Sequence, residues 1–72
     1  MNKLKKVVLE VKVGDAFLCI KSSEYFTKGR VYKVQSFNYD VGLMSTEVEF
    51  LDNDYDIHAV TEKFLNINFK KQ

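Results

Sequence analysis

The sequence predicts a small, mostly β domain: a closed barrel of about five antiparallel strands, with one short helical turn before the last strand. Gly29 stands directly before a run rich in β-branched and aromatic residues that begins at Val31. Residues 44–51 alternate between two sets of side chains with the period of a strand. Turn-forming segments separate these runs, and several short strands in a small chain close on themselves or leave long unpaired edges.

The first third of the chain predicts two strands and a loop. Residues 4–11 are β-prone but rich in lysine, which predicts an edge strand or a loose arm. Residues 13–15 (VGD) predict a turn, and residues 17–20 form an apolar run of strand length. Residues 22–28 are polar enough to predict a surface loop.

Gly29 is the predicted pivot between that loop and a second strand at residues 30–38. Glycine adopts a positive φ angle without steric cost, so the chain can turn sharply here. Tyr32 and Val34 share one face of the predicted strand. We expect this even-numbered face to pack inward.

The second half of the chain predicts a hairpin. Residues 39–42 connect the second strand to the alternating strand at residues 44–51. Residues 52–55 (DNDY) predict a turn, because short Asx side chains satisfy nearby backbone donors. Residues 56–60 then form the second arm of the hairpin.

The last elements follow Thr61. Its hydroxyl is expected to accept a hydrogen bond from an unpaired backbone N–H and so to cap a helical turn over residues 62–64. Residues 66–69 are the predicted final strand.

Length and composition predict a single domain, residues 1–72, with a small core. Hydrophobic residues make up 46% of the chain and charged residues 29%, which is typical of a folded protein. Cys19 is the only cysteine, so no intrachain disulfide forms, and a cytoplasmic location is expected. No segment has the roughly 20 consecutive apolar residues of a membrane-spanning helix.

Charge is distributed unevenly along the chain, although the net charge is only +1. Residues 1–33 carry eight of the eleven basic residues. Residues 34–69 carry seven carboxylates and a single lysine, Lys63. Because the two halves interleave in a compact barrel, we expect opposite charges to meet across strands.

Two segments carry a resemblance to a known fold family. Residues 26–34 (FTKGRVYKV) and residues 60–69 (VTEKFLNINF) resemble the diverging turn, and the short helical turn and last strand, of a Src-homology-3-like barrel. The order of a Gly-Asp turn, an apolar strand and a KGxxYxV step is also similar to small barrel proteins encoded by bacterial viruses. The resemblance covers residues 13–69 and implies a barrel fold and, for a viral protein, a place in the host cytoplasm.

The chain departs from true Src-homology-3 domains in the residues that bind proline-rich ligands. It has no tryptophan, and Glu24 is the only acidic residue in residues 22–28, the loop that would contact the ligand's arginine. We therefore do not expect binding of proline-rich peptides.

No set of residues predicts an enzyme, a metal site or a cofactor. Asp52, Asp54 and Asp56 have the alternate spacing of calcium ligands, but the glycine and the glutamate that a calcium loop needs later are replaced by Ile57 and Lys63. Cys19 and His58 are a nucleophile and a base in principle. Cys19 lies within an apolar run, which is typical of a small buried hydrophobic residue.

Aromatic residues make up 14% of the chain, more than so small a core fully buries. Aromatic side chains near loops are common anchors of protein interfaces. We therefore predict a non-enzymatic protein-binding module, such as a phage-encoded modulator or inhibitor of a bacterial host protein. The candidate partner-binding residues are Tyr25, Phe26, Phe37, Tyr39 and Tyr55. The alternative for Phe26 is that it folds under its loop and plugs the barrel.

A second hypothesis is nucleic-acid binding along a lysine-rich edge, with aromatic rings that stack on bases. The candidate residues are Lys3, Lys5, Lys6, Lys28, Arg30 and Lys33. A sequence pI near 7.8 argues against it, because nucleic-acid-binding domains are usually strongly basic. Homo-oligomerisation through the first strand or the loop aromatics is a third alternative.

Overall fold

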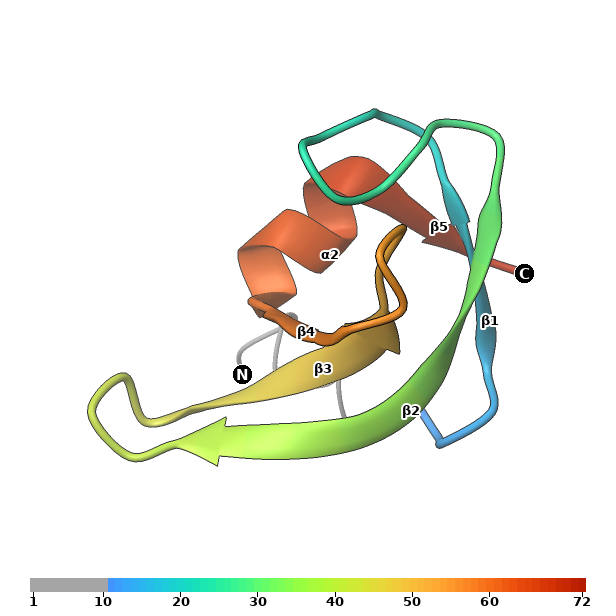
Figure 1. Cartoon of the computed structure of the whole chain (residues 1–72). Helices are drawn as coiled ribbons and strands as arrows, with labels where there is room; N and C mark the ends of the chain where they lie inside the picture. Colours follow the sequence, from blue (N-terminus) through green and yellow to red (C-terminus); the bar gives the residue numbers. More distant parts are fainter. Residues whose placement is uncertain (1–10) are drawn as a thin grey trace.

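A computed structural model of the chain describes residues 11–72 and shows a five-stranded antiparallel sheet with one helix before the last strand (Figure 1). The strands are β1 (Ala16–Cys19), β2 (Val31–Asp40), β3 (Ser45–Leu51), β4 (Ile57–Val60) and β5 (Phe69–Lys71), and the helix is α2 (Glu62–Asn68). Their order in the sheet is β4-β3-β2-β1-β5. Within residues 11–72 the sheet is not closed, because β4 and β5 are its two edges.

Strand β1 begins after the predicted turn, one residue earlier than expected. The N–H of Asp15 donates to the carbonyl of Lys12 at 3.0 Å, and Gly14 has a φ of +92°. Strand β1 then lies between β2 and β5, with Phe17 opposite Tyr32 and Leu18 opposite Lys70. The prediction of a turn at residues 13–15 is confirmed.

The inward face of β2 changes along the strand. Tyr32 and Val34 are buried, as predicted for the even-numbered face. The register then shifts between Val34 and Ser36, which is a β-bulge. Beyond this bulge Phe37 lies opposite the buried Val48, so the inward face is odd-numbered from there on. The prediction of one continuous even-numbered inner face is therefore wrong for the second half of β2.

The turn between β2 and β3 comprises residues 41–44, two residues later than predicted. Met44 was expected to begin the alternating strand, but it lies in the turn with a φ of 52°. Four-residue hairpin loops are commonly built around a type I turn. The β2–β3 hairpin projects from the body of the protein (Figure 1).

Thr61 caps helix α2 as predicted. Its side-chain oxygen accepts from the N–H of Phe64 at 3.1 Å. The helix is longer than the single turn expected, and residues 66–68 belong to it, so the prediction that the last strand begins at residue 66 is wrong. Leu65 and Asn68 are one turn apart and both buried, and the Asn68 amide donates to the carbonyl of Lys21 at 3.1 Å. These contacts favour continued helix, and β5 begins at Phe69.

The core lies between the concave side of the sheet and α2 (Figure 1). Phe26 lies near its centre, although it comes from the β1–β2 loop. Its ring packs against Tyr32, Phe50 and Phe69 with centroid distances of 5.0–5.9 Å. The buried apolar residues are Val11, Phe17, Cys19, Phe26, Tyr32, Val34, Val48, Phe50, Val60, Leu65 and Phe69.

Candidate partner-binding surface

Phe26 is a core residue and not part of a binding surface. Its exposed fraction is 1%, and its ring makes edge-on contacts on several sides. The hypothesis that it anchors a partner is therefore wrong, and the alternative that it folds under its loop is right. Burial of a phenylalanine recovers about 1.5–3 kcal/mol relative to exposure, which explains why the loop folds over it.

Tyr25, its neighbour in the loop, is only partly available. Its exposed fraction is 36%, and its ring lies against the ring of His58 with centroids 4.7 Å apart. The backbone carbonyl of Tyr25 accepts from the N–H of Asn53 at 2.9 Å. Tyr25 thus joins the β1–β2 loop to the β3–β4 turn and remains partly exposed to solvent.

Asn53 links the β3–β4 turn to the β1–β2 loop through its side chain as well. Its Nδ2 donates to Thr27 Oγ1 at 3.0 Å, and its Oδ1 accepts from the buried Tyr32 hydroxyl at 2.7 Å. The Tyr32 hydroxyl in turn accepts from the Thr27 N–H at 2.8 Å. Sequence reasoning treated Asn53 only as a turn former, because its partners are 21 and 26 residues away along the chain.

Asp52 organises the β3–β4 turn. Its Oδ1 accepts from the N–H groups of Asp54 and Asp56, and its Oδ2 lies 3.3 Å from His58 Nδ1. Burial of the Asp52 carboxyl by itself raises its pKa, but the two N–H donors and His58 outweigh this effect and hold the pKa below its usual value. The prediction of a polar turn is confirmed.

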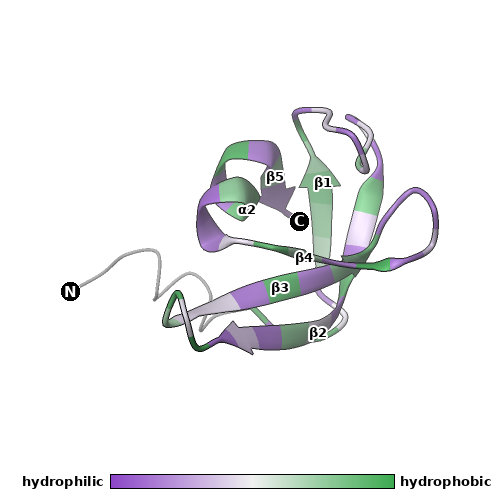
Figure 2. Ribbon diagram, turned by 60° about the vertical axis from the view of Figure 1, so that its left-hand side comes forward, coloured by the Kyte–Doolittle hydropathy of each residue, from purple (hydrophilic) through white to green (hydrophobic). Residues whose placement is uncertain are grey.

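Phe37 and Tyr39 lie on the projecting β2–β3 hairpin, with exposed fractions of 38% and 57%. The turn beyond them is also apolar, since Val41, Leu43 and Met44 are exposed by 77%, 64% and 78%. We call Tyr39, Val41, Leu43 and Met44 the hairpin-tip patch. Figure 2 shows the hydrophobic colour continuing into this turn.

Sequence reasoning missed three of the four hairpin-tip residues. Residues 39–42 were interpreted as a connection and Met44 as part of a strand. A signal was present in the sequence, because turns are usually made of Gly, Asn, Asp, Ser and Pro, whereas Val41, Leu43 and Met44 flank the single glycine here.

Tyr55 lies far from the hairpin tip, in the β3–β4 turn, and is 78% exposed. The structure brings it together with Arg30 and Lys33, because all three line one pocket. Lys28 is exposed in the β1–β2 loop. The other three residues of the proposed lysine-rich edge, Lys3, Lys5 and Lys6, lie outside the described residues.

The structure does not assemble the nucleophile and base considered above. Cys19 is buried in β1, with 1% of its surface exposed, and its thiol donates to the carbonyl of Lys21 at 3.3 Å. His58 instead faces Asp52 and Tyr25. Among residues 11–72, no three His, Cys, Asp or Glu side chains gather closely enough to hold a metal ion.

Comparison with protein families, curated proteins and solved structures finds no match to this chain. Within residues 11–72, no helix has the length and hydrophobicity needed to cross a bilayer.

Proposed function

We propose that this chain is a non-enzymatic protein-binding module, a Src-homology-3-like barrel that inserts the tip of its β2–β3 hairpin into an apolar groove of a larger protein. The pairing of β5 with β1 supports the barrel assignment, because the last strand of a small barrel lies beside its first strand. The resemblance to proteins of bacterial viruses supports a host protein in the cytoplasm as the partner and modulation of that protein as the role.

The observation that carries the proposal is the exposure of the hairpin-tip patch. Scattered exposed apolar residues are normal on protein surfaces and need no explanation. Here four large apolar side chains lie within six consecutive residues, each at least 57% exposed, at the end of a projecting hairpin (Figures 1 and 2). A contiguous apolar patch at a projecting site is typical of a protein interface.

The charge of the hairpin indicates the chemistry of the partner. Residues 34–51 carry Asp40, Glu47 and Glu49 and no lysine or arginine. Two of these carboxylates are held across the strands, since Glu49 accepts from Ser36 and Glu47 from Asn38. An apolar groove bordered by lysine or arginine is therefore the complementary surface, because matched charges steer association and fix register.

Capture from bacterial lysate on the immobilised full chain tests this proposal through matched variants. The Val41→Ser, Leu43→Ser double variant removes two patch residues, and the Val13→Ser, Ile67→Ser double variant removes two exposed aliphatic residues elsewhere. We expect a stoichiometric partner that the wild type and the control variant retain and that the patch variant binds at least about 10-fold more weakly. No stoichiometric partner, or equal retention by both variants, would contradict the proposal.

A further inference from the structure

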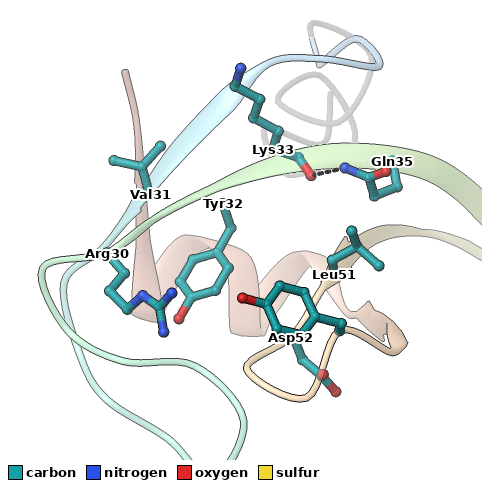
Figure 3. Close-up of a pocket in the computed structure, with 8 residues that line it drawn as sticks. Arg30, Val31, Tyr32, Lys33, Gln35, Leu51 and Asp52 are labelled. Carbon is teal, nitrogen blue, oxygen red and sulfur yellow. Dashed lines mark hydrogen bonds between the residues drawn. The ribbon is translucent and has the colours of Figure 1, made fainter.

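A pocket of about 180 Å³ lies between the start of β2 and the β3–β4 turn, at the opposite end of β2 from the hairpin tip (Figure 3). Its apolar lining includes Val31, Leu51 and Tyr55, and its basic lining includes Arg30 and Lys33. The lining residue of β2 nearest to the hairpin tip is Gln35, four residues before Tyr39, and a strand rises about 3.3 Å per residue, so about 13 Å of strand lies between them. The pocket is therefore a separate site, and its interpretation does not rest on the proposed hairpin function.

The apolar lining of the pocket is accessible. Val31 is 52% exposed, Leu51 37% and Tyr55 78%. Tyr55 has a φ of 61°, a left-handed conformation that an aromatic residue adopts only at a cost. Its N–H donates to the Asp52 carbonyl at 3.0 Å, a bond that any residue except proline makes equally well. The folded turn thus does not need the tyrosine side chain, which is free to contact a ligand.

The basic side chains of the pocket form no ion pair within residues 11–72, where Lys71 pairs with Asp15. The Arg30 guanidinium donates to Asn53 Oδ1 in a long hydrogen bond of 3.4 Å. In Figure 3 this guanidinium lies beside Tyr32, whereas the Lys33 side chain extends in the opposite direction. The two positive charges are therefore well separated, which suits a ligand with two separated anionic groups.

Asp52 also lines the pocket, but its carboxylate is already engaged by two N–H groups and His58. Figure 3 shows this carboxylate pointing away from Arg30 and Tyr32. Asp54 and Asp56 are exposed on either side of Tyr55 in the chain. They would repel a nucleic-acid backbone, which carries a charge at every nucleotide, more than a peptide with a few carboxylates.

We propose that this pocket binds an extended acidic peptide segment of a partner protein. An apolar side chain of the peptide packs against Val31, Leu51 and Tyr55, and two of its carboxylates pair with Arg30 and Lys33. Alternate residues of an extended peptide point to the same side and lie about 6.6 Å apart, so an apolar residue with an acidic residue two positions before it and another two positions after it presents both kinds of group to the pocket.

The test is a titration of the isotopically labelled full chain at low salt, followed by backbone amide chemical shifts. The probe is the blocked peptide acetyl-Glu-Ser-Leu-Ser-Glu-amide, which has its leucine and both glutamates on one side when extended, and its control is the same peptide with each Glu replaced by Gln. We expect the acidic peptide to shift the amides of Val31, Lys33, Leu51 and Tyr55, and to bind at least about 5-fold more tightly than the control, as expected for one or two exposed ion pairs.

Matched variants locate the contact. We expect Lys33→Gln to weaken peptide binding about 3-fold to 5-fold, whereas Lys63→Gln, an exposed charge change on α2, leaves binding unchanged. Tyr55→Phe retains binding and Tyr55→Gly weakens it, while both variants keep the wild-type fold by the same spectra.

Several outcomes would overturn the proposal. They are the absence of shifts at millimolar peptide, equal binding of the glutamine control, and equal weakening by Lys33→Gln and Lys63→Gln. A further one is that an eight-nucleotide oligothymidylate shifts the same amides at lower concentration than the acidic peptide, which would assign the pocket to nucleic acid.

Discussion

The two turns that flank strand β3 are built in opposite ways. Each contains a large apolar residue at positive φ, Met44 at 52° and Tyr55 at 61°, and both side chains are 78% exposed. The β3–β4 turn is otherwise polar and bonded to the β1–β2 loop through Asn53. The β2–β3 turn is apolar, and its own bonds are Met44 N–H to Val41 O at 3.3 Å and Leu43 N–H to Asp40 Oδ1 at 3.0 Å.

If the hairpin tip binds a partner as proposed, this difference separates stability from recognition within one small domain. Residues that join the β3–β4 turn to the β1–β2 loop close the structure over Phe26, so changes there are expected to reduce stability. Residues of the hairpin tip contribute little to the core, so changes there are expected to reduce partner binding alone. Substitutions made in pairs, one in each region, test this separation.

The largest difference is expected between Phe26→Ala and Leu43→Ala. Removing a buried phenylalanine costs about 3–5 kcal/mol, much of the total stability of about 5–15 kcal/mol of a typical domain. Leu43 is 64% exposed, so its replacement is expected to change stability by less than about 0.5 kcal/mol. Urea unfolding followed by circular dichroism measures both, and a similar loss in the two variants would contradict the assignment of Phe26 to the core.

The next difference is expected between Asn53→Ala and Asn38→Ala. Asn53→Ala leaves the buried Tyr32 hydroxyl without its acceptor and separates the turn from Thr27, at a cost of about 1–3 kcal/mol. Asn38 makes an exposed bond to Glu47 at 3.0 Å, so its replacement costs less than about 0.5 kcal/mol.

Amide hydrogen exchange gives the Asn53 comparison a local readout. Asn53→Ala is expected to accelerate exchange at Thr27, whose N–H donates to the Tyr32 hydroxyl at 2.8 Å, before it affects the strands. Unchanged exchange at Thr27 would show that the loop and the turn hold their positions without Asn53.

Gly29→Ala and Gly42→Ala compare a glycine from each region. Gly29 has a φ of +92°, where an L-residue is strained, so the expected loss of stability is about 1–2 kcal/mol. Gly42 does not have a positive φ, and a Cβ there would meet only the end of the Asp40 side chain, at 3.3 Å. Its replacement is expected to cost less than about 0.5 kcal/mol, as thermal unfolding can measure.

Local chemistry explains which features were predictable from the sequence. The Thr61 cap, the positive φ of Gly29 and the Asp52 turn each depend on residues within a few positions along the chain, and all three were predicted correctly. The mostly β class also follows from local alternation.

The features that were not predicted depend on distant contacts. The bulge after Val34 reverses which side chains of β2 face inward, and alternation alone gives no sign of it. The burial of Phe26, which the sequence left open as an alternative to exposure, depends on strands β2, β3 and β5 meeting beneath its loop. The predicted partner-binding residues do not form one surface for the same reason. Tyr39 and Tyr55 lie at opposite ends of the β2–β3 ribbon, and their separation depends on how the strands pair.

Met44→Gly and Tyr55→Gly form the comparison with the smallest expected change, and here the direction of the change in stability matters most. Glycine relieves a left-handed strain of about 1–2 kcal/mol but costs about 0.5–1 kcal/mol in backbone entropy, so each variant should be as stable as the wild type or up to about 1.5 kcal/mol more stable. For a domain of this size each kcal/mol gained corresponds to a rise in Tm of about 4–8 °C, which thermal unfolding measures.

If both tyrosine and methionine serve recognition, the two glycine variants gain or keep stability while each loses a different interaction. Met44→Gly should weaken capture of the hairpin's protein partner and leave binding of the acidic peptide unchanged. Tyr55→Gly should weaken binding of the acidic peptide and leave capture of the protein partner unchanged. A loss of stability in either variant would show that its exposed side chain stabilises the fold. That result would contradict the view that this residue serves recognition and not stability.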